Sequence, residues 1–143
     1  MAKFKRNKLN NIIILSGFAA IALFMIIFTI IMITPVFTID SYDDMKEITY
    51  AEALTQKKDS YYVAFVNEND DNSEELEAAI AHYAEYARIG GGDKIYVVFT
   101  NKKENSSSTY KAPTLIYVSD GKASETFKSP ATIMNKLNDL INK

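Results

Sequence analysis

The sequence predicts an α/β domain, with a mixed sheet flanked by helices, preceded by one N-terminal transmembrane helix. Three observations support this prediction: one long uncharged apolar run, several short runs rich in β-branched and aromatic residues, and amphipathic helical patterns among them. Short apolar runs bounded by polar turns are typical of buried strands. The expected divisions are a basic tail over 1–11, a transmembrane helix over 12–33, a tether over 34–44 and the folded domain over 45–143.

The apolar run over residues 12–33 contains no charged side chain. As a helix it would span roughly 30 Å, the hydrocarbon thickness of a bilayer. A cleaved signal peptide is an alternative, but its apolar region is shorter and ends in small residues, whereas this run ends in "IMITPVF". A buried core helix is a second alternative, disfavoured because the run is apolar on every side. An uncleaved anchor is therefore expected.

Basic residues lie before this run, and no other charge precedes Asp40: they are Lys3, Lys5, Arg6 and Lys8. The positive-inside rule then predicts a single-pass protein of the cell membrane, with a cytoplasmic N-terminus and an extracellular C-terminal domain. The abundance of Lys, Asn and Ile is associated with bacterial genomes rich in A and T. We therefore expect the protein to come from a Gram-positive bacterium.

The rest of the chain is acidic and contains no cysteine. Of the 16 Lys and Arg residues, the four in the basic tail leave 12, against 18 Asp and Glu, a net charge of −6. This balance argues against nucleic-acid binding, which needs a basic face. The lack of Cys excludes disulfides, thiolate catalysis and thiolate metal sites. No cofactor is expected.

In the first half of the domain, a short strand and a weakly amphipathic helix are expected over 45–59. The run "YYVAFVN" at 61–67 predicts a buried strand. A helix is expected over 73–88, with Asn72 as its N-cap and an acid three residues on, as in a capping box. Three glycines at 90–92 are expected to end this helix.

In the second half, strands are expected over 94–100, 114–118 and 123–127. A helix joins the first of these to the preceding strand, which predicts a parallel, right-handed crossover. The tight turn "SDGK" predicts an antiparallel hairpin between the last two strands. Ser129 would cap a closing helix that begins at Pro130. Helices are expected on both faces of the sheet.

This order of elements, with the pieces "YYVAF", "KAPTLIYVSDGK" and "SPATIMNKLNDLI", resembles the thioredoxin fold. The closest local match is the segment "APTL", residues 112–115, because thioredoxin-like proteins carry a cis-proline there, followed by an apolar strand. The resemblance covers about residues 45–142 and implies a cis bond before Pro113. The connection that leads to Pro113 is too short for the full third helix of the family.

The same resemblance implies the loss of redox chemistry. The two cysteines of a redox-active member would fall at Asp70 and Ser73, where this chain has "DDNS" in place of C-x-x-C. Thiol–disulfide exchange needs a thiolate activated at a helix N-terminus, and neither a carboxylate nor a hydroxyl replaces it. The chain is therefore expected to be a membrane-anchored thioredoxin-like protein without redox activity.

A protein or peptide partner is expected at the surface around the cis-proline loop. In redox-active relatives this loop faces the reactive turn and pairs its backbone with a substrate peptide, and such strand-like hydrogen bonds could persist here. An aromatic side chain just before the loop would suit an interface. The residues predicted to bind the partner are Asp70, Ser73, Tyr110, Ala112, Pro113 and Thr114.

Two alternatives remain open. The acidic turn over 68–75 could form a metal-dependent site of an enzyme or a Ca²⁺-binding module, with hard oxygen ligands from Glu68, Asp70, Asp71 and Glu74. The EF-hand spacing is absent, because Glu75 stands where the motif has Gly, and acids that favour a helix N-terminus are the simpler interpretation. The second alternative is a purely structural subunit of an envelope or secretion complex.

A serine hydrolase is disfavoured. Ser73 and His82, the only His, are nine residues apart on one predicted helix, which separates them by about 13 Å on opposite faces. A Ser–His pair needs contact at about 3 Å. The sequon that begins at Asn105 is interpreted as a chance match.

Overall fold

The computed structural model of the protein describes residues 2–33 and 38–143. The chain divides into two compact units, with the boundary between Phe37 and Thr38. The first part of the predicted tether, residues 34–37, lies outside the described residues. Its remainder, from Thr38 onward, belongs to the second unit.

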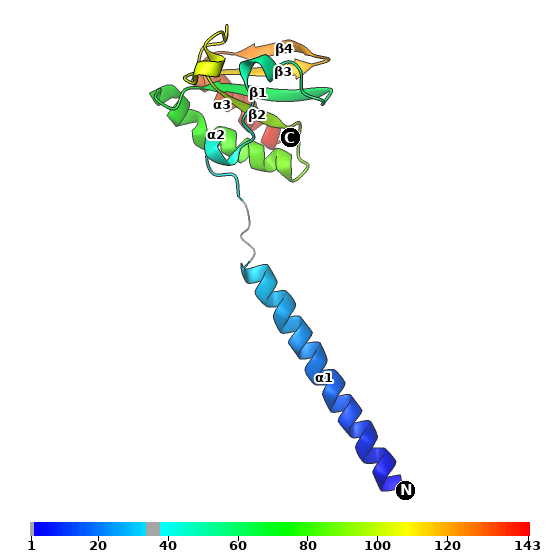
Figure 1. Ribbon diagram of the computed structural model, residues 1–143. Helices are drawn as coiled ribbons and strands as arrows, with labels where there is room; N and C mark the ends of the chain where they lie inside the picture. The colour runs from blue at the N-terminus through cyan, green and yellow to red at the C-terminus, as the bar shows by residue number, and fades with distance from the viewer. Residues whose placement is uncertain (1, 34–37) are drawn as a thin grey trace. The chain divides into compact units, whose positions relative to one another are not determined.

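The N-terminal unit is one helix, α1, Ala2–Ile33 (Figure 1). Its segment Asn7–Met32 has a mean hydropathy of 2.7 and none of it is buried, so it is long and apolar enough to cross a membrane. Two hydroxyls in this helix donate to backbone carbonyls of the preceding turn, Ser16 to Ile13 and Thr29 to Met25. Such internal bonds are what a polar side chain needs inside a bilayer.

The C-terminal unit is built on a four-stranded sheet in the order β2-β1-β3-β4. The strands are β1 Ser60–Val66, β2 Ile95–Phe99, β3 Thr114–Ser119 and β4 Lys122–Phe127. β1 and β2 pair in parallel, whereas β3 pairs antiparallel with both β1 and β4. The mixed sheet, the parallel crossover and the hairpin are thus confirmed.

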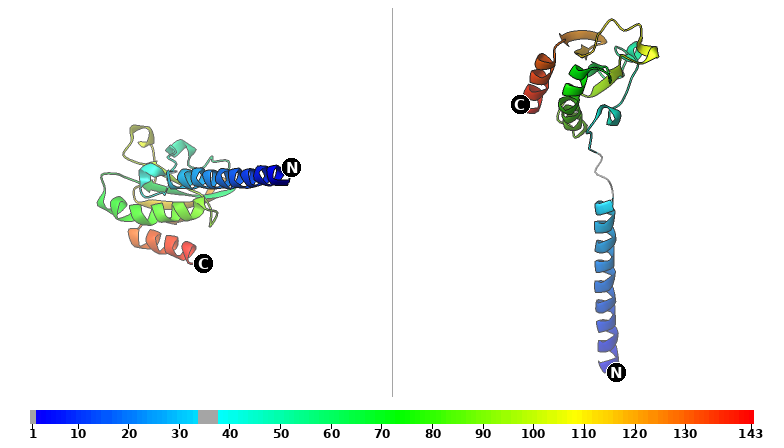
Figure 2. Two further views of the ribbon diagram at one scale, coloured as in Figure 1. Left: turned by 90° about the horizontal axis from the view of Figure 1, so that it is seen from below. Right: turned by 90° about the vertical axis from the view of Figure 1, so that its left-hand side faces the viewer.

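Both long helices of this unit, α2 Asp71–Arg88 and α3 Pro130–Ile141, pack against each other on one face of the sheet (Figures 1 and 2). The expectation of helices on both faces is therefore wrong. Two short 3₁₀ turns, Tyr50–Glu52 and Lys103–Asn105, accompany the connections that cover the other face. Within the described residues, these connections contain no α-helix.

The sheet has a hydrophobic core on each face, because side chains alternate along a strand. On β1 the side chains that face α2 and α3 are Tyr62, Ala64 and Val66. Those that face the other side are Tyr61, Val63 and Phe65. All of β1 after its first residue is buried, which explains why this strand reads as an unbroken apolar run.

The start of α2 and the segment before β1 differ from expectation. Helix α2 begins at Asp71, with Asp70 rather than Asn72 as the N-cap, because the Asp70 carbonyl accepts the amides of Ser73 and Glu74. Residues 45–59 form no α-helix. They contain one parallel bridge, from Glu47 to β2, followed by a 3₁₀ turn.

The closing helix agrees with its signals. The hydroxyl of Ser129 accepts the amide of Thr132 at 3.3 Å, and Pro130 is the first helical residue. In the preceding hairpin, Asp120 and Gly121 have φ of 51° and 74°, the left-handed region that a tight hairpin turn requires.

Buried tyrosines make the stability of the domain sensitive to alkali. Burial, with the charge of Glu125 next in importance, raises the pKa of Tyr62 to about 12, and burial also raises the pKa values of Tyr42 and Tyr83. Between pH 10 and 12 the folded state keeps protons that the unfolded chain releases, so the free energy of unfolding falls as pH rises. Below about pH 10 both the folded and the unfolded chain keep these protons, so the tyrosines do not make the free energy of unfolding depend on pH.

We expect the thermal midpoint to decrease from about pH 10 upward, each such tyrosine contributing up to about 1.4 kcal/mol per pH unit. Tyr62→Phe should make the decrease less steep, because the variant lacks one of these protons. Circular dichroism melting curves across this range measure the effect. An identical slope in the two proteins would contradict the assignment to Tyr62.

Candidate functional site

The turn between β1 and α2 is closed by its own hydrogen bonds. Ser73 is fully buried, and its hydroxyl accepts the amide of Asn67 at 3.0 Å and donates to an Asp70 carboxylate oxygen at 3.4 Å. The carbonyl of Ser73 accepts the hydroxyl of Tyr42, which is also buried. Ser73 therefore lies inside the domain, where a partner could not reach it.

Two acids of this turn, Glu68 and Glu74, line a hollow together with Asp43 and Glu77. Glu68 accepts a hydrogen bond from the Asn101 amide at 3.3 Å, and Asp71 and Glu74 are exposed in the first turn of α2. Negative charges at this end favour the helix through its dipole. Within residues 2–33 and 38–143, no three His, Cys, Asp or Glu side chains gather in a way that could hold a metal ion.

His82 lies on the same helix as Ser73, and its side chain is exposed whereas Ser73 is buried. The two side chains therefore do not meet. Sequence spacing alone had already disfavoured this pair as a nucleophile and base.

The second candidate surface surrounds the Ala112–Pro113 peptide bond, which is cis. A hollow of about 470 Å³ lies there, lined by Thr109, Tyr110, Lys111, Ala112, Pro113, Thr114, Thr126 and Lys128. Four of the six predicted partner-binding residues share this hollow. Asp70 and Ser73 do not line it.

The walls of the hollow are fixed by packing and pairing. The ring of Tyr110 stacks on Phe65 of β1, with 4.7 Å between ring centroids and 24° between planes. The hydroxyl of Thr114 donates to the carbonyl of Lys111 at 2.5 Å, which closes the loop on itself. Thr114 also pairs with Phe65 at the start of β3. The loop is thereby held at the end of the sheet.

The charge of the hollow is opposite to that of the domain. Lys111 and Lys128 are exposed cations in its lining, and none of the described residues that line it is acidic. Backbone N–H and C=O groups are also available for pairing with another strand, because β4 is an edge strand whose first five residues are exposed. The site can therefore pair with an extended backbone and attract a negative side chain.

The wall formed by Thr126 and Lys128 was missed by the sequence analysis. A hairpin paired by simple counting from its turn would place Glu125 opposite Ile116. The structure pairs Ile116 with Thr126 instead, because a bulge shifts the register beyond Tyr117. A slip of one residue exchanges the two faces of a strand, so counting assigns the wrong side chains to the hollow.

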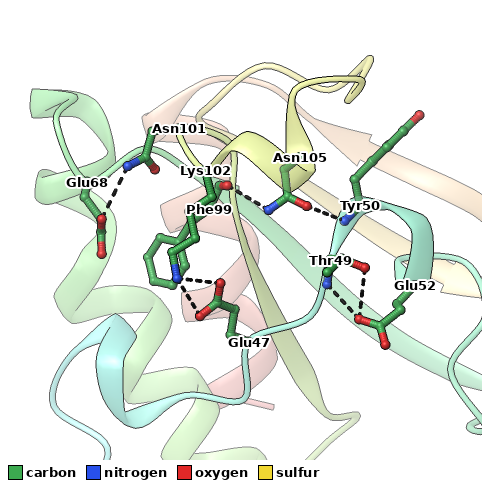
Figure 3. A network of polar contacts seen from close by, with 9 residues as sticks. All are labelled: Glu47, Thr49, Tyr50, Glu52, Glu68, Phe99, Asn101, Lys102 and Asn105. Carbon is green, nitrogen blue, oxygen red and sulfur yellow. Dashed lines mark hydrogen bonds and ion pairs between the residues drawn. The ribbon is translucent and has the colours of Figure 1, made fainter.

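A buried amide anchors the loop that leads to the hollow (Figure 3). Asn105 is only 1% exposed; its side chain accepts the amide of Tyr50 at 2.7 Å and donates to the carbonyl of Phe99 at 2.9 Å. Nearby, Lys102 pairs with Glu47 at 2.7 Å, which raises the pKa of the lysine. These bonds join the loop after β2 to the segment before β1.

Comparison with solved structures agrees with this geometry. Mitochondrial thioredoxin 3 from Saccharomyces cerevisiae, in its oxidised form, matches with a TM-score of 0.52 and 11% identity, over 68% of this chain and 97% of that chain. Thioredoxin f2 from Chlamydomonas reinhardtii matches with a TM-score of 0.51 and 15% identity, over 68% of this chain and 94% of that chain. The C-terminal unit therefore has the thioredoxin fold.

Sequence comparison adds no closer relationship. No protein-family model and no curated protein matches the chain. The chain has no cysteine, so the fold is present without its C-x-x-C motif.

Proposed function

We propose that this protein is a membrane-anchored thioredoxin-like module without redox activity that holds an extended segment of a partner protein at the hollow beside Pro113. The observation that carries the proposal is the hollow itself, where the cis-proline loop meets an open edge strand and two lysines. The segment it takes carries an acidic side chain, because Lys111 and Lys128 face no acid within the lining.

The lack of cysteine supports a role in binding rather than in electron transfer. Without a thiolate, a thioredoxin fold cannot exchange disulfides. The turn at which the thiols would lie is also closed by the buried Ser73 and its bonds to Asn67 and Asp70. The cis-proline side is thus the part of the expected surface that still offers an accessible hollow.

We further propose that α1 anchors the module in the cell membrane of a Gram-positive bacterium, with the C-terminal unit outside. The apolar stretch Asn7–Met32 and the basic residues at the N-terminus support this orientation. Protease added to intact cells should then degrade the C-terminal unit while a cytoplasmic control protein survives. Protection of the unit until the cells are lysed would refute the orientation.

The partner site is tested by peptide selection on the full chain in detergent micelles. We expect a random peptide display library to yield extended peptides enriched in Asp or Glu. Lys111→Glu with Lys128→Glu should reduce their affinity at least tenfold, because each lost charge-assisted contact is worth about 1.5–3 kcal/mol. Fluorescence anisotropy with a selected peptide measures the change.

The matched control is Lys57→Glu with Lys58→Glu, which makes the same change of charge in the exposed connection before β1. The affinity should stay close to that of the unmodified chain. Selection of no acidic peptides, or equal losses in the two double variants, would argue for a purely structural subunit.

A further inference from the structure

The C-terminal unit has a second surface of distinct chemistry, a cationic groove between α2 and the start of β2. It has a volume of about 180 Å³ and an apolar floor that contains Ile39, Met45, Ala84, Ala87, Ile95 and Tyr96. Three basic side chains complete its lining: Lys46, Arg88 and Lys94. All three are exposed, although the unit as a whole is acidic.

An exposed apolar side chain directly follows a residue of the groove lining in the sequence. Ile89 follows Arg88 at the C-terminal end of α2 and is 71% exposed. Among the described residues of the C-terminal unit, the only other large hydrophobic side chain classed as exposed is Leu54, at 40%. A single projecting isoleucine beside basic side chains has the composition of a surface that enters the headgroup region of a bilayer.

The three basic side chains of the groove differ in whether they form an ion pair with a carboxylate. Arg88 pairs with Glu85, and Lys46 lies 5.5 Å from the centre of the Tyr96 ring. Within the described residues, Lys94 makes no ion pair. Lys46 and Lys94 therefore carry positive charge that no carboxylate of the described chain neutralises at salt-bridge distance.

The covalent chain limits how far this groove can be from the apolar helix. Helix α1 ends at Ile33, and Ile39 lines the groove. Whatever conformation the intervening residues adopt, six residues of backbone reach roughly 20 Å at full extension. This limit follows from chain length alone and holds for any arrangement of the two units.

We propose that this groove docks on the surface of a bilayer that contains anionic phospholipid, with Ile89 inserted between headgroups and Lys46 and Lys94 next to phosphates. The proposal rests on the membrane anchoring proposed above and is independent of the peptide site. The unit carries a net negative charge, so an anionic surface favours its two cationic surfaces, this groove and the hollow beside Pro113. Of these two, only the groove has the exposed Ile89 directly after its lining in the sequence. Docking fixes which side of the anchored unit faces the membrane.

The chain contains no cysteine, so a single introduced cysteine can be labelled without background. The full chain with Ile89→Cys carries an environment-sensitive nitrobenzoxadiazole label and is placed in nanodiscs of phosphatidylcholine, with or without phosphatidylglycerol. We expect the emission to shift to shorter wavelength and increase when phosphatidylglycerol is present. Lys46→Glu with Lys94→Glu, or added salt without any substitution, should abolish the shift.

The matched control is Ser124→Cys, an exposed position on β4, where the label should respond to neither lipid. Emission at position 89 that does not depend on the lipid, or an equal shift at position 124, would overturn the docking proposal. A chain that fails to remain with the discs would overturn the anchoring as well. Peptide binding by Lys111→Glu is measured separately in the same discs, because it tests the peptide site and not the docking on the bilayer.

Discussion

Asp70→Cys and Ser73→Cys, introduced together, are expected to form an intramolecular disulfide and to give the domain a redox-active turn. The two positions are the N-cap and the third residue of α2, and their side-chain oxygens are 3.4 Å apart. A helix N-terminus lowers the pKa of a thiol placed there, which increases its reactivity as a thiolate. Titration of free thiols before and after mild oxidation measures bond formation.

Reduction of insulin by the oxidised and re-reduced protein then tests for exchange activity, which the unmodified chain is expected to lack. The control pair is Asp70→Cys with Asn72→Cys, because residues two apart in a helix turn point in different directions. The control should keep two free thiols or form dimers between chains. The same behaviour in the Asp70/Ser73 variant would mean that this turn does not have the geometry of a redox site.

Asn105→Ala is expected to destabilise the domain by about 2–4 kcal/mol, because it leaves two backbone groups without their partner. The amide of Tyr50 and the carbonyl of Phe99 both bond to this side chain. The loss should also loosen the connection that leads to the cis-proline loop. Urea unfolding of the full chain in detergent, followed by tyrosine fluorescence, gives the free energy.

Asn101→Ala provides the comparison. Asn101 is exposed and its amide makes one bond, to Glu68 at 3.3 Å, so its removal should change the free energy of unfolding by less than about 0.5 kcal/mol. Equal effects of the two substitutions would show that the buried bridge does not hold the loop. In the folded chain the side chain of Asn105 is buried and is therefore not accessible to a glycan.

Much of the sheet and the closing helix could be predicted because their signals are local. β1 is apolar along nearly its whole length, the turn at Asp120 and Gly121 carries its own conformational preference, and Ser129 and Pro130 mark a helix start. Such patterns depend on neighbouring residues and survive without knowledge of the tertiary structure.

The segment that leads into β1 could not be predicted, because distant contacts impose its structure. The amide of Ile48 donates to Val97 on β2 at 2.9 Å, and that of Tyr50 bonds to Asn105. Neither partner is visible from the local sequence, whose weak helical period suggested a helix instead. Tertiary contacts commonly override such weak propensities.

In the candidate site, too, some features could be predicted from the local sequence and others depend on tertiary contacts. The resemblance at residues 112–115 predicted the cis-proline side of the hollow, whereas the bulge in β4 concealed Thr126 and Lys128. Ser73 lies in the first turn of a helix, as predicted, although the helix begins two residues earlier than predicted. The burial of its side chain depends on tertiary contacts, among them the bond from Tyr42, and is not visible in the local pattern.

The segment that precedes β1, residues 38–59, has a mechanical consequence. In the arrangement proposed above, with α1 as a membrane anchor and a partner beside Pro113, tension between the two passes along the chain from Thr38 to β1. At the edge of β2 this segment is secured by two backbone hydrogen bonds, from Val97 to the Lys46 carbonyl and from Ile48 to the Val97 carbonyl. Load applied at Thr38 would first reach the hydrogen bonds that Ile39 and Tyr42 donate to α2. It would reach the two bonds at β2 next, and only then the strands that carry the hollow.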